Sequence, residues 1–95
     1  MSIFDIFRKK NEIDLEAQRR EHLLRNGRIT EGRITDSETT ENGEVVYYFY
    51  SVHGVDFESS ELLTDEQLSE PLKYAPGAKI GVRYDQKQHG NSMLV

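Results

Sequence analysis

The chain has 95 residues, no cysteine and a formal net charge of −5 at pH 7. This length predicts one domain, near the lower end of what a single hydrophobic core stabilises. The lack of cysteine excludes a disulfide framework, a thiolate nucleophile and a Cys-based zinc site, and it agrees with a reducing cytoplasm. No run approaches the roughly 20 apolar residues that a membrane-spanning helix needs. The start is not a secretory signal either, because its basic cluster follows its apolar residues.

The negative charge is concentrated in the middle of the chain. Residues 34–72 contain ten Asp or Glu residues and no Lys or Arg. Such a surface repels phosphate backbones, so nucleic acid is excluded as a partner. Two interpretations stay open, a solvated surface that keeps the protein soluble and a docking face for a basic partner protein.

Residues 1–10 form an apolar-basic N-terminal tip. On a helix its apolar residues would share one face, and its three cations would each gain roughly 1 kcal/mol near anionic lipid. We favour docking of the tip on the protein's own sheet or on a second copy, as a homo-oligomer; the alternative that stays open is weak peripheral membrane contact. The candidate residues for membrane or partner contact are Ile3, Phe4, Ile6, Phe7, Arg8, Lys9 and Lys10.

Residues 11–27 predict a surface helix. Asn11 suits its N-cap, and Gly27 suits a left-handed residue at its end. The apolar stripe is thin, so we expect weak packing. The expected packing residues are Ile13, Ala17, Leu23 and Leu24.

Residues 28–95 predict a β domain that opens with a hairpin. The first strand ends near Thr40 and needs a bulge at Gly32, or a start there, because Ile29 and Ile34 fall on opposite faces. Asn42-Gly43 is the strongest signal for a tight hairpin turn. Both faces of the second strand, Glu44 to Val52, are apolar, so we expect it to be central and covered on both sides.

Turn signals divide the remaining residues into three more strands. His53-Gly54 makes a second tight turn before a third strand from Val55 to about Leu63, and Thr64 begins a capping box that predicts a short helix. Pro76-Gly77 supplies another turn, a fourth strand covers 78–84, and a short fifth strand covers 92–95. The predicted fold is mainly β, or α+β if the helix is counted. We expect a small antiparallel five-stranded barrel or sandwich preceded by one helix.

Four segments in this order resemble a bacterial family, the domain of unknown function 3592, over residues 32–95. They are Gly32-Arg-Ile-Thr, Tyr48-Phe-Tyr-Ser-Val-His-Gly-Val-Asp-Phe57, Tyr74-Ala-Pro-Gly77 and Ile80-Gly-Val-Arg-Tyr-Asp85. Where the family usually has Tyr-Asp-Pro-x-Asn-Pro, this chain lacks both prolines, which predicts a less rigid loop. The resemblance implies a small all-β domain, often attached to membrane-embedded or envelope proteins of bacteria. It implies no activity.

No set of residues predicts chemistry. His22, His53 and His89 share no metal-ligand spacing, and we expect them to be ordinary surface or turn residues. The serines lack a nucleophile-elbow pattern, and the carboxylate pairs fit a solvated face. We therefore expect no catalytic, cofactor-binding or metal-binding residues, no cofactor and no enzyme activity.

The resulting hypothesis is a non-catalytic cytoplasmic interaction or accessory domain with an unidentified protein partner. Two alternatives stay open. One is a peripheral membrane adaptor anchored by the N-terminal tip, and the other is an acidic inhibitor of a basic partner protein.

Overall fold

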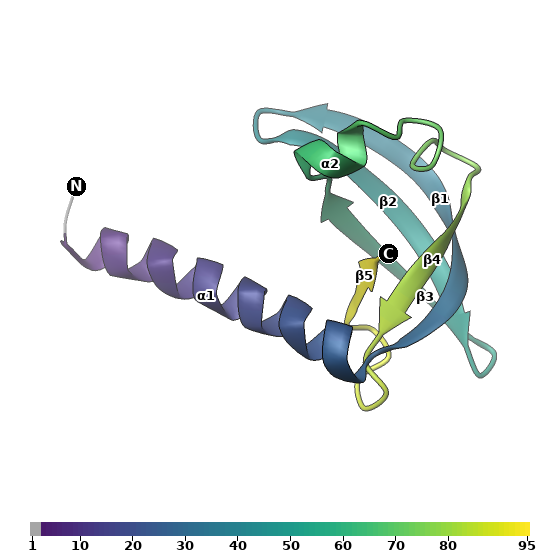
Figure 1. Ribbon diagram of the computed structural model, residues 1–95, viewed down its shortest axis with the longest axis horizontal. Helices are drawn as coiled ribbons and strands as arrows, with labels where there is room; N and C mark the ends of the chain where they lie inside the picture. Colours follow the sequence, from purple (N-terminus) through teal and green to yellow (C-terminus); the bar gives the residue numbers. More distant parts are fainter. Residues whose placement is uncertain (1–2) are drawn as a thin grey trace.

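The structure is a computed structural model that describes the backbone of residues 3–95 and the side chains from residue 15 onward. Five strands form one antiparallel sheet with the order β3-β2-β1-β4-β5. The sheet curls into a half-barrel, and its two edge strands, β3 and β5, come back into contact (Figure 1). This confirms the predicted mainly β, five-stranded antiparallel fold. The elements are α1 (Ile3–Asn26), β1 (Arg28–Thr40), β2 (Gly43–Val52), β3 (Val55–Leu62), α2 (Asp65–Leu68), β4 (Lys79–Tyr84) and β5 (Ser92–Leu94).

Helix α1 begins at Ile3 and not at Asn11, so one helix covers most of the predicted tip as well as the predicted helix. Only its C-terminal end lies against the sheet, near β4 and β5, while the rest extends away (Figure 1). Leu23 is fully buried, as expected, but Ala17 is exposed and Leu24 is 58% exposed. The expected packing of Ile13 lies outside the described side chains.

Gly27 ends the helix for a reason other than the predicted one. Its φ angle is not positive, so the left-handed end predicted there is wrong. A Cβ atom on Gly27 would lie 2.5 Å from the Leu23 carbonyl oxygen and 2.8 Å from Cγ of Arg83. Glycine is needed because a side chain here would collide with the carbonyl group of the preceding helical turn and with Arg83 of β4.

Strand β1 is continuous through Gly32, so the bulge or strand start predicted there is wrong. Gly32 pairs with Tyr50 on one side and Ile80 on the other. A Cβ atom at this position would lie 2.5 Å from Cγ2 of Val82 and 2.8 Å from the Phe49 carbonyl oxygen. The position therefore requires glycine because two neighbouring strands leave no space for a side chain.

The bulge in β1 occurs later, between Ile34 and Asp36, where Thr35 is the extra residue. Ile34 is 1% exposed and points into the half-barrel, whereas Ile29 is 57% exposed on the outside. The two isoleucines therefore need no bulge between them, because one of them simply lies on the outer face.

Of the two predicted tight turns, His53-Gly54 is confirmed, whereas Asn42-Gly43 is placed one residue too late. The turn between β1 and β2 uses Glu41-Asn42, and Gly43, with φ of 127°, already belongs to β2. In the turn between β2 and β3, both central residues have positive φ, 52° at His53 and 81° at Gly54. That pair is the one whose twist matches the flanking strands of a two-residue hairpin.

Strand β2 lies between β1 and β3, as expected, but only one of its faces is buried. Val46, Tyr48, Tyr50 and Val52 line the interior, while Tyr47 on the other face is 38% exposed. The expectation that both faces are covered is therefore wrong, because the sheet curls around its own inner face. Helix α1 packs against β4 and β5, with an ion pair to β3, and leaves the outer face of β2 open. The core consists of Ile34, Val46, Tyr48, Tyr50, Val52, Leu63, Tyr74, Ile80, Val82, Tyr84 and Leu94.

The connection from β3 to β4 follows the sequence closely. The Thr64 hydroxyl accepts a hydrogen bond from the Gln67 amide, and the Gln67 side chain accepts one from the Thr64 amide, which confirms the capping box at α2. Gly77 has a φ of 90°, as the predicted Pro76-Gly77 turn requires. These local signals hold because each depends on residues three positions apart or fewer.

Candidate functional site

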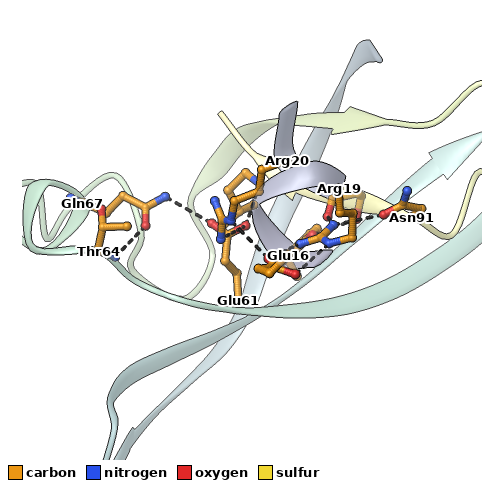
Figure 2. Close-up of polar contacts among 10 residues, drawn as sticks. Glu16, Arg19, Arg20, Glu61, Thr64, Gln67 and Asn91 are labelled. Carbon is orange, nitrogen blue, oxygen red and sulfur yellow. Dashed lines mark hydrogen bonds and ion pairs between the residues drawn. The ribbon is translucent and has the colours of Figure 1, made fainter. Parts of the chain in front are cut away.

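The edge strands β3 and β5 do not pair through their backbones, and polar side chains fill the gap between them. We call this network the seam (Figure 2). Helix α1 supplies two of its residues, β3 one, and the segments around α2 and β5 the others. Its members are Arg19, Arg20, Glu61, Gln67, Asn91 and Ser92.

Glu61 is the centre of the seam, with a side chain only 4% exposed. Its Oε1 accepts a hydrogen bond from the Leu94 amide at 3.2 Å, and its Oε2 accepts one from Nε2 of Gln67 at 3.1 Å. Nη2 of Arg20 lies 3.5 Å from Oε1. A buried carboxylate needs such partners, since an unpaired one is very costly.

Arg19 completes the seam from the helix side. Its Nη1 donates to the Ser92 carbonyl oxygen at 2.8 Å and to Oδ1 of Asn91 at 3.0 Å. Glu16, one turn earlier, holds the guanidinium through two more hydrogen bonds, which raise the pKa of Arg19 and lower that of Glu16. The helix thereby presents a fixed donor to the edge of β5.

The seam takes the place of a further strand that would pair with the free edge of β5. The amide of Val95 donates to Gly81 in β4, so the neighbouring groups, Leu94 N–H and Ser92 C=O, point away from β4. Glu61 accepts from the first group and Arg19 donates to the second. Unpaired edge groups are otherwise a template for another chain, and here side chains satisfy them.

Tyr48 contacts the seam from inside the half-barrel. Its hydroxyl lies 2.7 Å from Oγ of Ser92, and both groups are buried. Burial raises the pKa of Tyr48 above its ordinary value, although the hydrogen bond to Ser92 acts in the opposite direction. Tyr50 beside it has a raised pKa for the same reason.

The contacts of the seam fasten α1 and β5 to β3. No buried side-chain nitrogen or oxygen in the described part of the chain lacks a hydrogen-bond partner. A cavity of about 310 Å³ opens beside the seam, but both cations and carboxylates line it, including Arg20, Glu66, Glu70 and Lys73. Such mixed charge selects no ligand of one sign.

A second region of interest is the outer face of β1, β2 and β3, which the register arranges in three rows. One row is Glu38, Val45 and Leu62, the next Asp36, Tyr47 and Ser60, and the last Arg33, Phe49 and Glu58. Tyr47 is 38% exposed and Leu62 44% exposed, and the hydroxyl of Tyr47 donates to Oε2 of Glu38 at 2.9 Å. We call these nine residues the outer face.

The structure brings together some of the residues considered from the sequence. His53 and His89 converge, with ring centroids 5.9 Å apart, while Nε2 of His22 faces Oδ2 of Asp85 at 3.4 Å. The side chains of the N-terminal tip, Ile3 to Lys10, lie outside the described side chains, although α1 includes their backbone.

Sequence reasoning missed Glu61 as the centre of a network. The one available signal was its position, because Glu61 falls on the same face of β3 as the inward Phe57. A carboxylate on a buried face implies a partner, but its partner Arg20 is 41 positions earlier on the helix. Among the side chains of residues 15–95, no group of three or more His, Asp or Glu could hold a metal ion. In the part of the chain that the structure describes, no helix is long and apolar enough to span a membrane.

The fold and the seam define a small antiparallel half-barrel domain with an N-terminal helix fastened across its open edges. Residues 25–95 match the family described as Domain of unknown function (DUF3592), so the chain belongs to that family. The match begins seven residues before the segment in which the sequence motifs suggest it. No curated protein and no solved structure matches the chain.

Proposed function

We propose that the protein is a non-catalytic interaction domain of the cytoplasm that binds a basic partner protein through its outer face. The observation that carries this proposal is the exposed apolar strip on β2 and β3, set among carboxylates. Val45, Tyr47 and Phe49 form the strip with Leu62, which is 44% exposed. Large apolar side chains that stay open to solvent on a sheet face are typical of contact surfaces.

Charge determines the class of partner. Asp36, Glu38 and Glu58 flank the strip, and Arg33 is its one cation, at the end of the last row. Glu38 also accepts a hydrogen bond from the Tyr47 hydroxyl, which raises the pKa of Tyr47. Lys or Arg side chains of a partner would gain from both the carboxylates and the Tyr47 ring.

Two further observations support the non-catalytic and cytoplasmic parts of the proposal. The polar groups of the seam bond to one another, which leaves them engaged in holding α1 and β5. The chain has no cysteine, which agrees with a reducing compartment.

The proposal is tested with an end-blocked peptide of alternating Arg and Val residues as the probe. We expect the peptide to shift the backbone amide NMR signals of β2 and β3 at low salt, with the largest changes around Tyr47 and Leu62. Replacing Glu38 and Glu58 together with Gln should weaken binding at least about fivefold, because both removed charges lie on the contact surface. Added salt should weaken it as well.

A matched control separates the outer face from acidity in general. Glu66 lies in α2 and Glu70 lies just after it, away from the outer face, and their double replacement with Gln removes the same charge. This control should bind the peptide as the wild type does. Equal weakening in both double variants, or amide shifts centred on α2, would contradict the proposal.

The position of α1 favours a second candidate, a peripheral membrane adaptor. Arg19, Arg20 and Leu23 fasten only the C-terminal part of the helix, whose 24 residues span about 36 Å. The apolar-basic tip therefore begins at the far end from the half-barrel (Figure 1). Binding to phosphatidylserine vesicles that disappears when residues 1–10 are deleted would support this function, and equal sedimentation of both proteins would contradict it.

A further inference from the structure

Two histidines converge at the end of the half-barrel where the β2–β3 turn meets the loop between β4 and β5. The ring centroids of His53 and His89 lie 5.9 Å apart, with 46° between the ring planes. His53 is exposed at the turn, while His89 is half-buried. The ring of His89 contacts Phe57 and Tyr84 in edge-to-face geometry, at 6.3 Å and 5.5 Å between centroids.

His89 is held at both its backbone and its ring. The Tyr50 hydroxyl donates to the His89 carbonyl oxygen at 2.5 Å, and Nε2 of His89 lies 3.0 Å from the Gln86 carbonyl oxygen. Because a carbonyl oxygen only accepts, this contact places the ring proton on Nε2 and leaves the lone pair of the neutral ring on Nδ1. A carbonyl that orients the ring in this way is the usual support of a metal-binding histidine.

The distance between the rings is close to that of a shared ion. Imidazole nitrogens bind Zn²⁺ at about 2.0–2.1 Å, so two rings on one tetrahedral ion have centroids about 5.2 Å apart. The observed 5.9 Å is longer by about 0.7 Å, so the exposed side chain of His53 has to turn toward His89 for both rings to bind one ion. We propose that His53 and His89 form a two-histidine site for a divalent transition-metal ion such as Zn²⁺.

Water completes the coordination in this site, because no third His, Asp or Glu joins the two rings in the described part of the chain. The bound ion would link the β2–β3 turn to the loop that covers this end of the half-barrel. The two rings come from positions 36 residues apart and meet only in the folded chain, so the ion stabilises the folded state by mass action.

The first test uses the full-length protein and ZnCl₂ up to about 1 mM, with the histidine ring signals followed by NMR. The rings of His53 and His89 should shift together along one saturable curve, while the ring of His22 should not move. The midpoint of thermal unfolding, Tm, should rise by about 2–5 °C at the end of the titration. Unmoved rings of His53 and His89, or shifts of all three histidines at the same concentration, would overturn the proposal.

Variants provide the second test. His53→Asn keeps a residue that tolerates the positive φ of 52° at this turn, and His89→Gln removes the other ring. Each should weaken Zn²⁺ binding at least about tenfold, while the control His22→Gln should leave it unchanged. Wild-type affinity in either test variant would refute the site. Should His89→Gln fail to fold, the ring shifts of the wild type and the His53→Asn variant decide.

Discussion

The hydroxyl of Tyr48 shows how a single polar group is accommodated inside a core built from aromatic rings. The group is buried beside Ser92, and its ring stacks on Tyr50 with centroids 6.0 Å apart. Burial favours the neutral phenol, which raises the pKa of Tyr48. The same side chain therefore provides apolar area to the interior and a hydrogen bond to the edge strand β5.

This raised pKa predicts a loss of stability in alkali. A phenol with a higher pKa in the folded than in the unfolded chain contributes stability that is present below the unfolded value of about 10, and loses it as the pH rises through the folded value. The urea midpoint should fall between about pH 9 and pH 11, and less steeply in Tyr48→Phe. Identical pH profiles for the two proteins would contradict the expectation.

Two glycines show that the sequence can indicate where glycine is required without indicating why. The sequence suggested special backbone geometry at Gly27 and Gly32, but neither has positive φ. Both are required because a Cβ atom would meet neighbours at 2.5 Å. Those neighbours come from other strands or from the previous turn, so their proximity is not visible in a local pattern.

At the scale of elements, α1 is attached by few side chains. The helical pattern identified its existence but not its start, because the tip and the region after Asn11 are each compatible with a helix. Among the described residues, Leu23 is buried completely while the adjacent Leu24 remains 58% exposed. Both residues are leucines in the same helical turn, so they have the same helix propensity and differ only in how much they pack against the sheet.

The pair yields a direct prediction. Leu23→Ala should lower the free energy of unfolding by about 2–5 kcal/mol, because it removes a buried side chain and leaves a cavity. Leu24→Ala should change it by no more than about 0.5 kcal/mol, as exposed positions do. Urea denaturation followed by circular dichroism measures both, and equal losses would show that α1 does not pack as described.

At the scale of the whole molecule, the seam decides how the sheet closes. Five strands leave two edges, and the half-barrel joins them through Glu61 and the two arginines of α1 instead of through a sixth strand. Helix and sheet are thus one unit even though few residues connect them.

Removing the central carboxylate tests this closure. Glu61→Ala should cost about 1–3 kcal/mol, because it leaves the Leu94 amide and the Gln67 side chain without their acceptor. Glu58→Ala, on the outer face of the same strand, should cost no more than about 0.5 kcal/mol. Amide hydrogen exchange at Leu94 should accelerate only in the first variant. Unchanged exchange there would mean that Glu61 does not hold β5.

The sequence by itself determined the elements whose signals are local. Alternation of apolar residues, turn residues and the Thr64 capping box predicted five strands and a short helix close to their observed positions along the chain, because each signal depends on neighbouring side chains and backbone angles. The family resemblance was also visible in short motifs, and residues 25–95 match that family.

Only the tertiary structure decided which strand face stays open, which glycines are crowded and which distant groups meet. The exposed side of β2, the pairing of Glu61 with Arg20 and the approach of His53 to His89 all depend on how the sheet curls and where the helix ends. The two contacts join residues 36 or more positions apart in the sequence. The exposure of β2 depends on the fact that no other element covers its outer face. No period of two or 3.6 residues encodes such distances, because periodicity specifies a face but not what lies opposite it.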